Sequence, residues 1–187
     1  MLDGATKAFI QGYNAEIGVD CDSQIIVAAD VVQAANDKEQ LIPMFEQVEE
    51  NTGEVPDTVV ADNGFFSQAN VEHVADNHSE PLIAPERLKH GDHPQPAPKG
   101  RIPKDIGVLD RMRRKFKTKY GKKTYAKRME SVEPVFGQIK EARGIRSFLL
   151  RGLEKVKAEW DLICLTHNIL KVWRHFWGRG RIARAWS

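Results

Sequence analysis

The stretch Tyr125-Ala-Lys-Arg-Met-Glu-Ser-Val-Glu-Pro-Val-Phe-Gly-Gln-Ile-Lys140 decides how the rest of the chain is interpreted. Its apolar side chains recur at the spacing of one helix face: Val132, Val135, Phe136 and Ile139. A neighbouring face carries an acid and a base with no bulky side chain between them: Glu133, Gly137 and Lys140. Such a face is more often solvated surface than a site. Tyr125 and Arg128 on the same helix, and Asp62 after a predicted strand, favour a site.

The first half of the chain predicts alternating strands and helices. Alternation over 13–20 and the apolar run 24–32 predict a β-hairpin, and 58–61 and 81–84 predict two short strands. One helix is expected after an Asp37 cap, with core residues Leu41, Met44, Phe45 and Val48, ending near residues 51–53. Another is expected after a Ser67 cap, with Val71, Val74 and Ala75 turned inward. This order indicates an α/β fold.

The second half predicts helices. Residues 85–105 are rich in Pro, Gly and His and predict an exposed loop. A basic helix is expected with Met112 and Phe116 turned inward. A turn at 120–123 should connect it to a second helix that ends near Gly144. Ser131 and Pro134 fit either the start of this second helix or a kink in its middle. A long helix over 153–177 keeps one face: Leu153, Val156, Trp160, Ile163, Leu170 and Trp173. The expected segments are 1–85, 86–107, 108–177 and a basic tail at 178–187.

Size and composition favour a soluble protein with a real core. The chain has 187 residues, of which 41% are hydrophobic and 29% charged. No apolar run is long enough to cross a membrane, and residues 1–7 lack the apolar core of a signal peptide. Cys21 and Cys164 lie far apart and are expected to be reduced, and His90 and His93 are expected to be loop residues rather than zinc ligands. These features predict a cytoplasmic location.

Positive charge is concentrated in one part of the sequence. Residues 99–128 contain thirteen Lys and Arg against two Asp, a local balance of +11, whereas the whole chain carries only +2. This separation predicts a surface that faces a polyanion. The basic residues expected to bind a DNA backbone without reading its sequence are Arg111, Arg113, Arg114, Lys115 and Lys119.

Two blocks of the sequence resemble a known family. Tyr125, Arg128, Glu133 and Lys140 resemble the tyrosine–arginine–glutamate–lysine signature of insertion-sequence DDE transposases, although four residues separate Arg128 from Glu133 where many members have three. The block Val59-Val-Ala-Asp62-Asn-Gly-Phe resembles the region around the second acid of that family. The stretch Gln11-Gly-Tyr-Asn14, followed by Ile25–Asp30, resembles the region upstream of that acid. The similarity runs from about residue 9 to residue 175.

The resemblance implies a fold and a chemistry. The implied fold is an RNase H-like mixed sheet flanked by helices, here without its first strand and with a helical C-terminal part. Asp62 and Glu133 are implied as catalytic residues and as ligands of two Mg²⁺ or Mn²⁺ ions, since such ions prefer carboxylate oxygens and assist phosphodiester cleavage. Tyr125, Arg128 and Lys140 are implied to contact DNA, in the form of transposon ends and target.

One carboxylate of the family is not found where the resemblance would place it. The first catalytic aspartate belongs to the first strand of the fold, and Asp3, Asp20 and Asp22 do not occupy that place. The chain is therefore expected to be a C-terminal transposase fragment that is inactive alone. The alternatives are a non-catalytic DNA-binding regulator derived from a transposase and an α/β interaction domain. The sequence leaves the oligomeric state open, with a homodimer among the assemblies considered.

Overall fold

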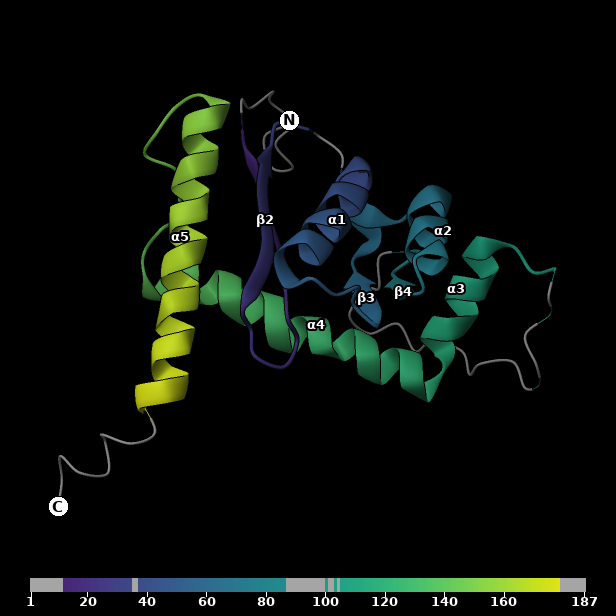
Figure 1. Ribbon diagram of the computed structural model, residues 1–187. Coiled ribbons are helices and arrows are strands. Elements are labelled where there is room, and N and C mark those ends of the chain that lie inside the picture. Colours follow the sequence, from purple (N-terminus) through teal and green to yellow (C-terminus); the bar gives the residue numbers. More distant parts are fainter. Residues whose placement is uncertain (1–11, 35–36, 87–99, 101–102, 104, 179–187) are drawn as a thin grey trace, which may run out of the picture. The chain divides into compact units, whose positions relative to one another are not determined.

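The computed structural model describes residues 12–34, 37–86, 100, 103 and 105–178 (Figure 1). These residues form two compact units with separate cores. Unit 1 combines the two ends of the chain, residues 1–35 and 131–187, and unit 2 comprises residues 36–130. Within the described ranges, no helix combines the length and apolarity needed to span a bilayer.

Unit 1 is built on the predicted hairpin. Strands β1 (Asn14–Val19) and β2 (Ile26–Val32) pair antiparallel from Asn14 opposite Val32 to Val19 opposite Ile26. The connecting turn is closed by the Asp20 carboxylate, which accepts from the Ser23 backbone N–H at 2.8 Å. Gln24 follows with a positive φ of 59°. The hairpin prediction is confirmed.

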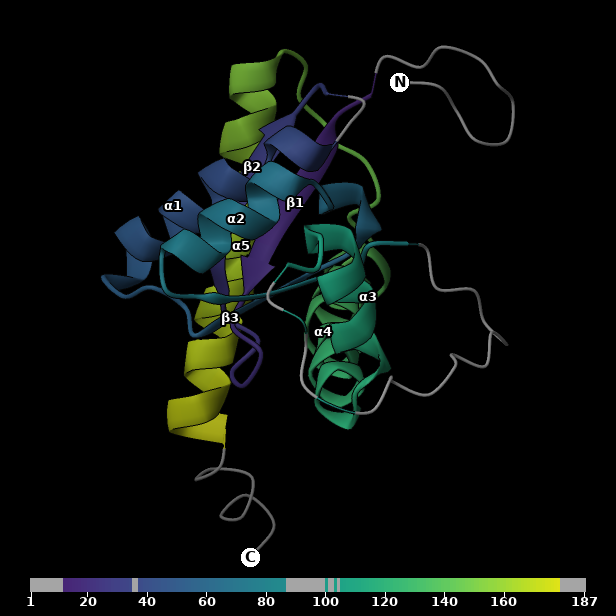
Figure 2. The same ribbon diagram turned by 90° about the vertical axis from the view of Figure 1, so that its right-hand side faces the viewer.

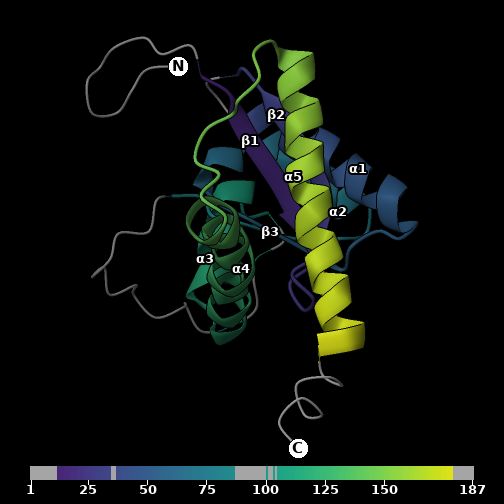
Figure 3. The ribbon, with the colours of Figure 1, turned by 90° about the vertical axis from the view of Figure 1, so that its left-hand side faces the viewer.

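Helix α5 (Leu153–Trp173) packs along β2 and extends as a short π-helix, η4 (Arg174–Gly178) (Figure 3). The unit 1 core holds the side chains predicted from both helices: Val135, Ile139, Val156, Trp160 and Ile163. The Trp160 indole N–H donates to the Glu16 carbonyl at 3.1 Å. Trp173 was expected on this face but is 51% exposed. Lys171 still reaches Gln24 in the hairpin turn, so residues beyond it lie past the surface that α5 covers.

Unit 2 is a two-stranded parallel sheet with helices. Strands β3 (Thr58–Ala61) and β4 (Glu80–Ile83) pair from Thr58 opposite Glu80 to Ala61 opposite Ile83. Helix α1 (Leu41–Thr52) and helix α2 (Gln68–Asp76) lie side by side in both views (Figures 1 and 2). The buried core consists mainly of aliphatic side chains from α1, α2 and β4, against which Val59 and Val60 of β3 pack: Leu41, Phe45, Val71, Val74, Leu82 and Ile83.

The helix ends in unit 2 test the predicted caps. The Ser67 hydroxyl accepts from the Asn70 N–H at 3.1 Å, as predicted for the start of α2, and Gly53 ends α1 with a left-handed φ of 74°. The Asp37 cap is wrong, because Gln40 precedes α1 without a side-chain cap. Asp37 instead begins a short 3-10 helix, η1 (Asp37–Glu39). Ala75 is exposed rather than inward because Val71 and Val74 already complete the apolar face.

The basic region forms two helices with a sharp break. Helix α3 (Val108–Lys117) buries Met112 and Phe116 as predicted, and α4 (Lys119–Gly137) follows after Thr118. The predicted turn at 120–123 is wrong, because Thr118 takes the extended conformation and its hydroxyl accepts from the Gly121 N–H at 2.9 Å. That capping bond allows α4 to begin immediately.

Helix α4 has its first turns in unit 2 and its last, from Ser131, in unit 1. Ser131 and Pro134 both lie inside it, which excludes a helix start there. Pro134 is followed four residues later by a change to a π-helix, η3 (Gln138–Ala142). The run ends before Gly144, whose φ is +70°, close to the predicted end.

The α/β class and the order of elements are confirmed through α3. The strands of the described residues form two two-stranded sheets, one in each unit, so a single RNase H-like mixed sheet stays a prediction. The two units also cut across the four segments expected from composition. Most of the predicted 85–105 loop, including His90 and His93, falls outside the described residues, as does most of the basic tail.

Candidate active site and nucleic-acid interface

Asp62 stands directly after the last residue of β3. Its backbone is extended, and its Oδ1 accepts from the Gly64 N–H at 2.9 Å, which caps the 3-10 turn η2 (Asn63–Phe65). The strand and the cap together fix the direction of the carboxylate. Asp62 is therefore both a turn aspartate and a rigidly held carboxylate at a strand end.

One of the predicted DNA-contacting residues, Arg128, lies beside Asp62, and a second, Tyr125, lies beside Arg128. Arg128 Nη2 is 3.3 Å from Asp62 Oδ2, and the Arg128 guanidinium carbon is 5.9 Å from the centre of the Tyr125 ring. Tyr125 packs edge-on against Phe116 of α3, with ring centres 4.8 Å apart. Tyr125 thus packs against the unit 2 core, and it also supports the arginine that faces Asp62.

A second carboxylate lies next to Asp62, and sequence reasoning missed it. A Cβ added at Gly64 would stand 3.0 Å from both Asp37 Oδ2 and Asp62 Oδ1. The buried Asn70 side chain holds the two loops together, because its Nδ2 donates to the Lys38 and Phe65 carbonyls, each at 2.7 Å. The signal available in the sequence was an Asp-rich turn before each helix, but it does not reveal that the two turns meet.

Glu133 and Lys140 belong to unit 1. Glu133 is exposed on α4, on the side away from the buried Val135 and Ile139. Lys140, in η3, is exposed and places its ammonium 4.9 Å from the centre of the Phe136 ring. The predicted division of this helix into an apolar and a polar face is confirmed. That Glu133 and Asp62 act together stays a prediction.

The donor set only partly suits a divalent ion. Carboxylate oxygens are the ligands that Mg²⁺ and Mn²⁺ prefer, and Asp37 and Asp62 supply them on either side of Gly64. However, Asp62 is already engaged by Arg128 and the Gly64 N–H. Among the residues that the structure describes, no group of three or more His, Cys, Asp or Glu is positioned to hold a metal. The described carboxylates thus have the right chemistry but not the number that a two-ion site needs.

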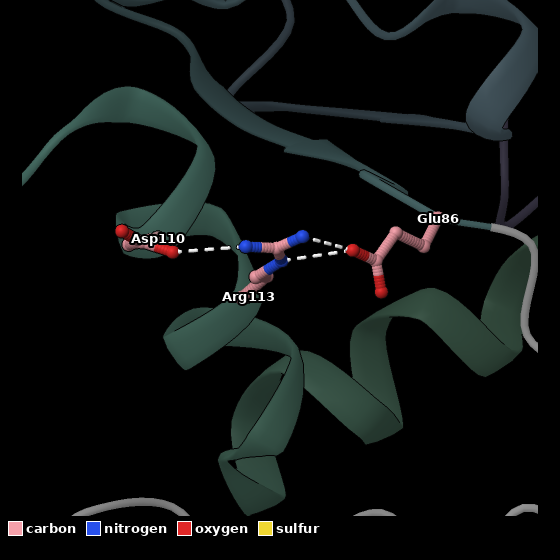
Figure 4. A network of polar contacts seen from close by, with 3 residues as sticks. All are labelled: Glu86, Asp110 and Arg113. Atoms are coloured by element: carbon pink, nitrogen blue, oxygen red, sulfur yellow. Dashed lines mark hydrogen bonds and ion pairs between the residues drawn. The ribbon is translucent and has the colours of Figure 1, made fainter.

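Several of the predicted basic residues make contacts within unit 2. Arg113 pairs with Glu86 and with Asp110, the latter at 3.1 Å (Figure 4). Arg114 donates to the Gly100 carbonyl at 2.6 Å. Arg111 and Lys119 are exposed at the surface of α3 and at the start of α4.

Lys115 joins α3 to β4 rather than projecting freely. Its ammonium lies 2.7 Å from Glu80 Oε1 and donates to the Pro81 carbonyl at 3.0 Å, while the Tyr120 hydroxyl donates to Glu80 Oε2 at 2.5 Å. Burial opposes ionisation of Glu80, but the hydrogen bonds from Lys115 and Tyr120 outweigh it and lower the pKa of this carboxyl. Lys115 therefore has a structural role in addition to its charge.

Together these features define an α/β protein with a carboxylate–arginine pair at a strand end and a helical region rich in cations. Residues 101–173 match the family model of the transposase DDE domain, a segment that includes Tyr125, Arg128, Glu133 and Lys140. In this C-terminal part the chain is similar to the DDE transposases. The matched segment is less than half of the chain, and Asp62 lies outside it. Comparisons with curated proteins and with solved structures found no match.

Proposed function

We propose that this chain is part of a DDE-type transposase that cleaves DNA and transfers its strands with the help of divalent metal ions. The observation that supports this most is the pairing of Asp62 with Arg128, because it joins a residue outside the family match to one inside it. In this proposal Asp62 and Glu133 are the catalytic carboxylates and metal ligands. The bound ions would supply Lewis-acid assistance to phosphodiester cleavage.

The roles of the remaining residues follow from their contacts. Arg128 pairs with Asp62 when no metal is present and contacts a phosphate when DNA is bound. A guanidinium can exchange the carboxylate for a phosphate because both are oxyanions. Lys140 contacts phosphate from its exposed place on η3. The chain by itself does not cut DNA in this proposal, because the described residues lack a third carboxylate within one group.

The same observations favour one alternative. A regulator that binds DNA without cutting it needs the basic surface and the transposase-like helices but no complete set of carboxylates. The engagement of Asp62 by Arg128 suits such a protein, since the guanidinium partners the carboxylate without a metal. Nicking activity separates the two functions.

Cleavage is tested on supercoiled DNA with Mg²⁺ or Mn²⁺. We expect no nicking by the 187-residue chain and metal-dependent nicking once a strand bearing an additional aspartate is joined to its N-terminus. In that extended protein, Asp62→Asn and Glu133→Gln should each abolish nicking, whereas Asp76→Asn, at the exposed end of α2, should not. Robust nicking by the unextended chain that survives Asp62→Asn would contradict the proposal, and tight DNA binding by an extended protein that never cuts would favour the regulator.

DNA binding is tested through its salt dependence. Because phosphate contacts release counterions, log K should fall steeply with log salt, and each contact removed should reduce the slope by about 1. Arg111→Ala and Lys119→Ala are therefore expected to lower both affinity and slope, while Lys38→Ala, in η1, should change neither. Equal slopes for all three variants would show that the α3–α4 surface does not contact DNA.

A further inference from the structure

The last turn of the α4 run differs from the turns before it. The backbone is α-helical up to Gly137, but from Gln138 it forms a π turn, in which the Arg143 N–H donates to the Gln138 carbonyl at 3.1 Å. The π form is rare, and single π turns within a helix are frequently found at functional sites. Lys140, the predicted phosphate contact, lies in the middle of this turn. The contacts that hold the turn therefore also set the direction of Lys140.

Both ends of the π turn are attached to the same stretch of α5. At the first end, Gln138 Oε1 lies 3.0 Å from His167 Nδ1. At the other end, Arg143 donates to the Ile163 carbonyl at 3.1 Å and to the Thr166 hydroxyl at 2.6 Å. The Thr166 hydroxyl donates to the Ile163 carbonyl at 2.9 Å, so its oxygen is free to accept from Arg143. These four residues are called the π-turn clamp here: Gln138, Arg143, Thr166 and His167.

His167 gives the clamp a buried support. Its side chain is 2% exposed, and its Nε2 lies 3.0 Å from the Gln24 carbonyl in the hairpin turn. Because a carbonyl can only accept, Nε2 carries the proton and donates. The amide of Gln138 has an accepting and a donating end, so it can bond to Nδ1 of either a neutral or a charged ring. The first end of the π turn is thus fixed to the hairpin as well as to α5.

The ammonium of Lys140 rests against an aromatic ring that belongs to the same unit. Its Nζ lies 4.9 Å from the centre of the Phe136 ring, and Phe136 stacks on the buried Trp160 with ring centres 6.2 Å apart. Lys140 is nevertheless exposed, so its charge remains available to a ligand. A lysine that is already held in place loses less conformational freedom on binding than a free one, which favours affinity.

We propose that the π-turn clamp positions Lys140 for contact with a DNA phosphate, and that Gln138 and His167 are positioning residues of the DNA-binding surface. Without the clamp, the last turn of this helix would fray, as unsupported helix ends do. Lys140 would then lose both its direction and its place against Phe136. The inference rests on the proposed function, in which Lys140 binds phosphate, and it adds the residues that make this binding possible.

The position of Lys140 is measured first without DNA. Its side chain lies over the Phe136 ring, which shifts the NMR signal of the ε-methylene protons from its value in an unstructured peptide, and Lys140→Arg assigns that signal. Gln138→Leu and Thr166→Val each remove one polar partner from the clamp. Each should therefore move the Lys140 signal towards the unstructured value.

Two controls separate the clamp from general stability. Thr166→Ser keeps the hydroxyl that accepts from Arg143 and should leave the Lys140 signal unchanged. Asn168→Ala removes the bonds of α5 to Ile26 but no contact of the clamp, so it should lower the unfolding midpoint without moving the signal. Thr166 is exposed, so Thr166→Val is expected to fold, and its circular dichroism spectrum should match that of the original chain.

A double-mutant cycle then tests the link to DNA. At low salt, Lys140→Ala should weaken duplex binding by about fivefold and reduce the salt slope by about 1. Gln138→Leu and Thr166→Val should each weaken binding by about threefold in the original chain and have no further effect once Lys140 is alanine. Residues that act through Lys140 must show this coupling, whereas residues that only stabilise unit 1 need not.

Two results would overturn the inference while leaving the proposed function intact. One is a Lys140 signal that does not move in Gln138→Leu and Thr166→Val. The other is an equal loss of DNA affinity from these two substitutions with and without Lys140, when Lys140→Ala itself weakens binding. Unchanged affinity and salt slope in Lys140→Ala would instead overturn the proposed role of Lys140, and the role of the clamp in DNA binding with it.

Discussion

At the scale of single residues, the candidate site depends on polar groups that join loops distant in sequence. Asn70 is 2% exposed, and its amide connects the turn that carries Asp37 to the turn that carries Asp62. Both bonds go to backbone carbonyls, and a buried polar group that loses its hydrogen bond costs stability. The position of Asp62 thus rests on a residue that has no chemistry of its own.

Asn70→Ala is expected to destabilise unit 2 by about 2–4 kcal/mol, because it leaves two carbonyls without their donor and opens a small cavity. Urea unfolding measures the loss. Gln68→Ala is the control: it lies two positions earlier, is exposed, and donates to Glu72 Oε1 at 2.8 Å, so its loss should cost about 0.5 kcal/mol or less. Equal effects of the two substitutions would show that the loop junction does not depend on Asn70.

His167 makes the stability of unit 1 depend on pH. Its ring nitrogens lie 3.0 Å from Gln138 Oε1 and 3.0 Å from the Gln24 carbonyl oxygen. Burial lowers the pKa of His167 below its usual 6.5, and the positive charges of Lys171 and Arg143 lower it further, against a hydrogen bond to Gln24 that raises it. The unfolded chain therefore takes up a proton at a higher pH than the folded chain does.

The free energy of unfolding should accordingly be fully retained above pH 6.5 and should fall as the pH drops from there towards the lower folded pKa. The contribution of one histidine is at most about 1.4 kcal/mol per pH unit. Urea unfolding between pH 7.5 and 5.5 measures this slope, which His167→Gln should reduce. His78→Asn, at an exposed histidine with positive φ, should leave the slope unchanged. The same slope in all three proteins would refute the assignment.

At the scale of elements, the junction of α3 and α4 brings two backbone segments into close approach. A Cβ at Gly121 would stand 2.1 Å from the Lys115 carbonyl oxygen, a separation that no backbone tolerates. The close approach exists because Thr118 interrupts the helices for a single residue and caps the second one. Glycine is required here for space, while its φ is not positive.

Gly121→Ala is therefore expected to destabilise unit 2 by about 3 kcal/mol or more, since the clash is with backbone and cannot be relieved by a rotamer change. Gly137→Ala is the contrasting variant. Gly137 has helical dihedrals and open space around its Cβ position, so alanine there should stabilise the protein by about 0.5–1 kcal/mol. Thermal unfolding of both variants should give shifts of opposite sign; shifts of the same sign would contradict the packing argument.

At the scale of the whole molecule, unit 1 is assembled from the two ends of the chain. Strand β2 buries Val31 and Ile26 against α5, and Asn168 of α5 binds both the N–H and the carbonyl of Ile26, at 2.9 and 2.8 Å. The hairpin thus depends on a helix that begins more than a hundred residues later in the sequence. Unit 2 has its own core and shares none of its buried residues with unit 1.

A chain that ends at Gly152 should lose the fold of unit 1. A two-stranded hairpin without a covering helix is marginal in water, so the amides of β1 and β2 should exchange with solvent at rates close to those of an unfolded chain. The amides of β3 and α2 should keep their protection, because the aliphatic core around Leu82 and Val74 is intact. Protection of β1 equal to that in the full chain would show that α5 is not what stabilises the hairpin.

Local patterns were sufficient for the elements and for individual side chains of the site. The hairpin, β3, β4, the Ser67 cap, and the buried Val135 and Ile139 follow from alternation, helical spacing and capping preferences, which act within a few residues. The break at Thr118 was not predicted, because Tyr120-Gly-Lys-Lys resembles a turn until the glycine is seen to pack against Lys115. Asp37 was assigned to a helix cap because Asp is a common capping residue, and the sequence does not show that a 3-10 helix separates it from α1.

The sequence by itself determined the order of strands and helices, the concentration of cations in 99–128, and the acid, arginine and tyrosine that resemble a transposase site. Only the tertiary structure decided that Arg128 faces Asp62, that Asp37 joins Asp62 at Gly64, and that both ends of the chain share one core. The physical reason is the range of the forces involved. Periodicity and caps are set by neighbours along the chain, whereas ion pairs and core contacts depend on the whole backbone path that brings distant residues together.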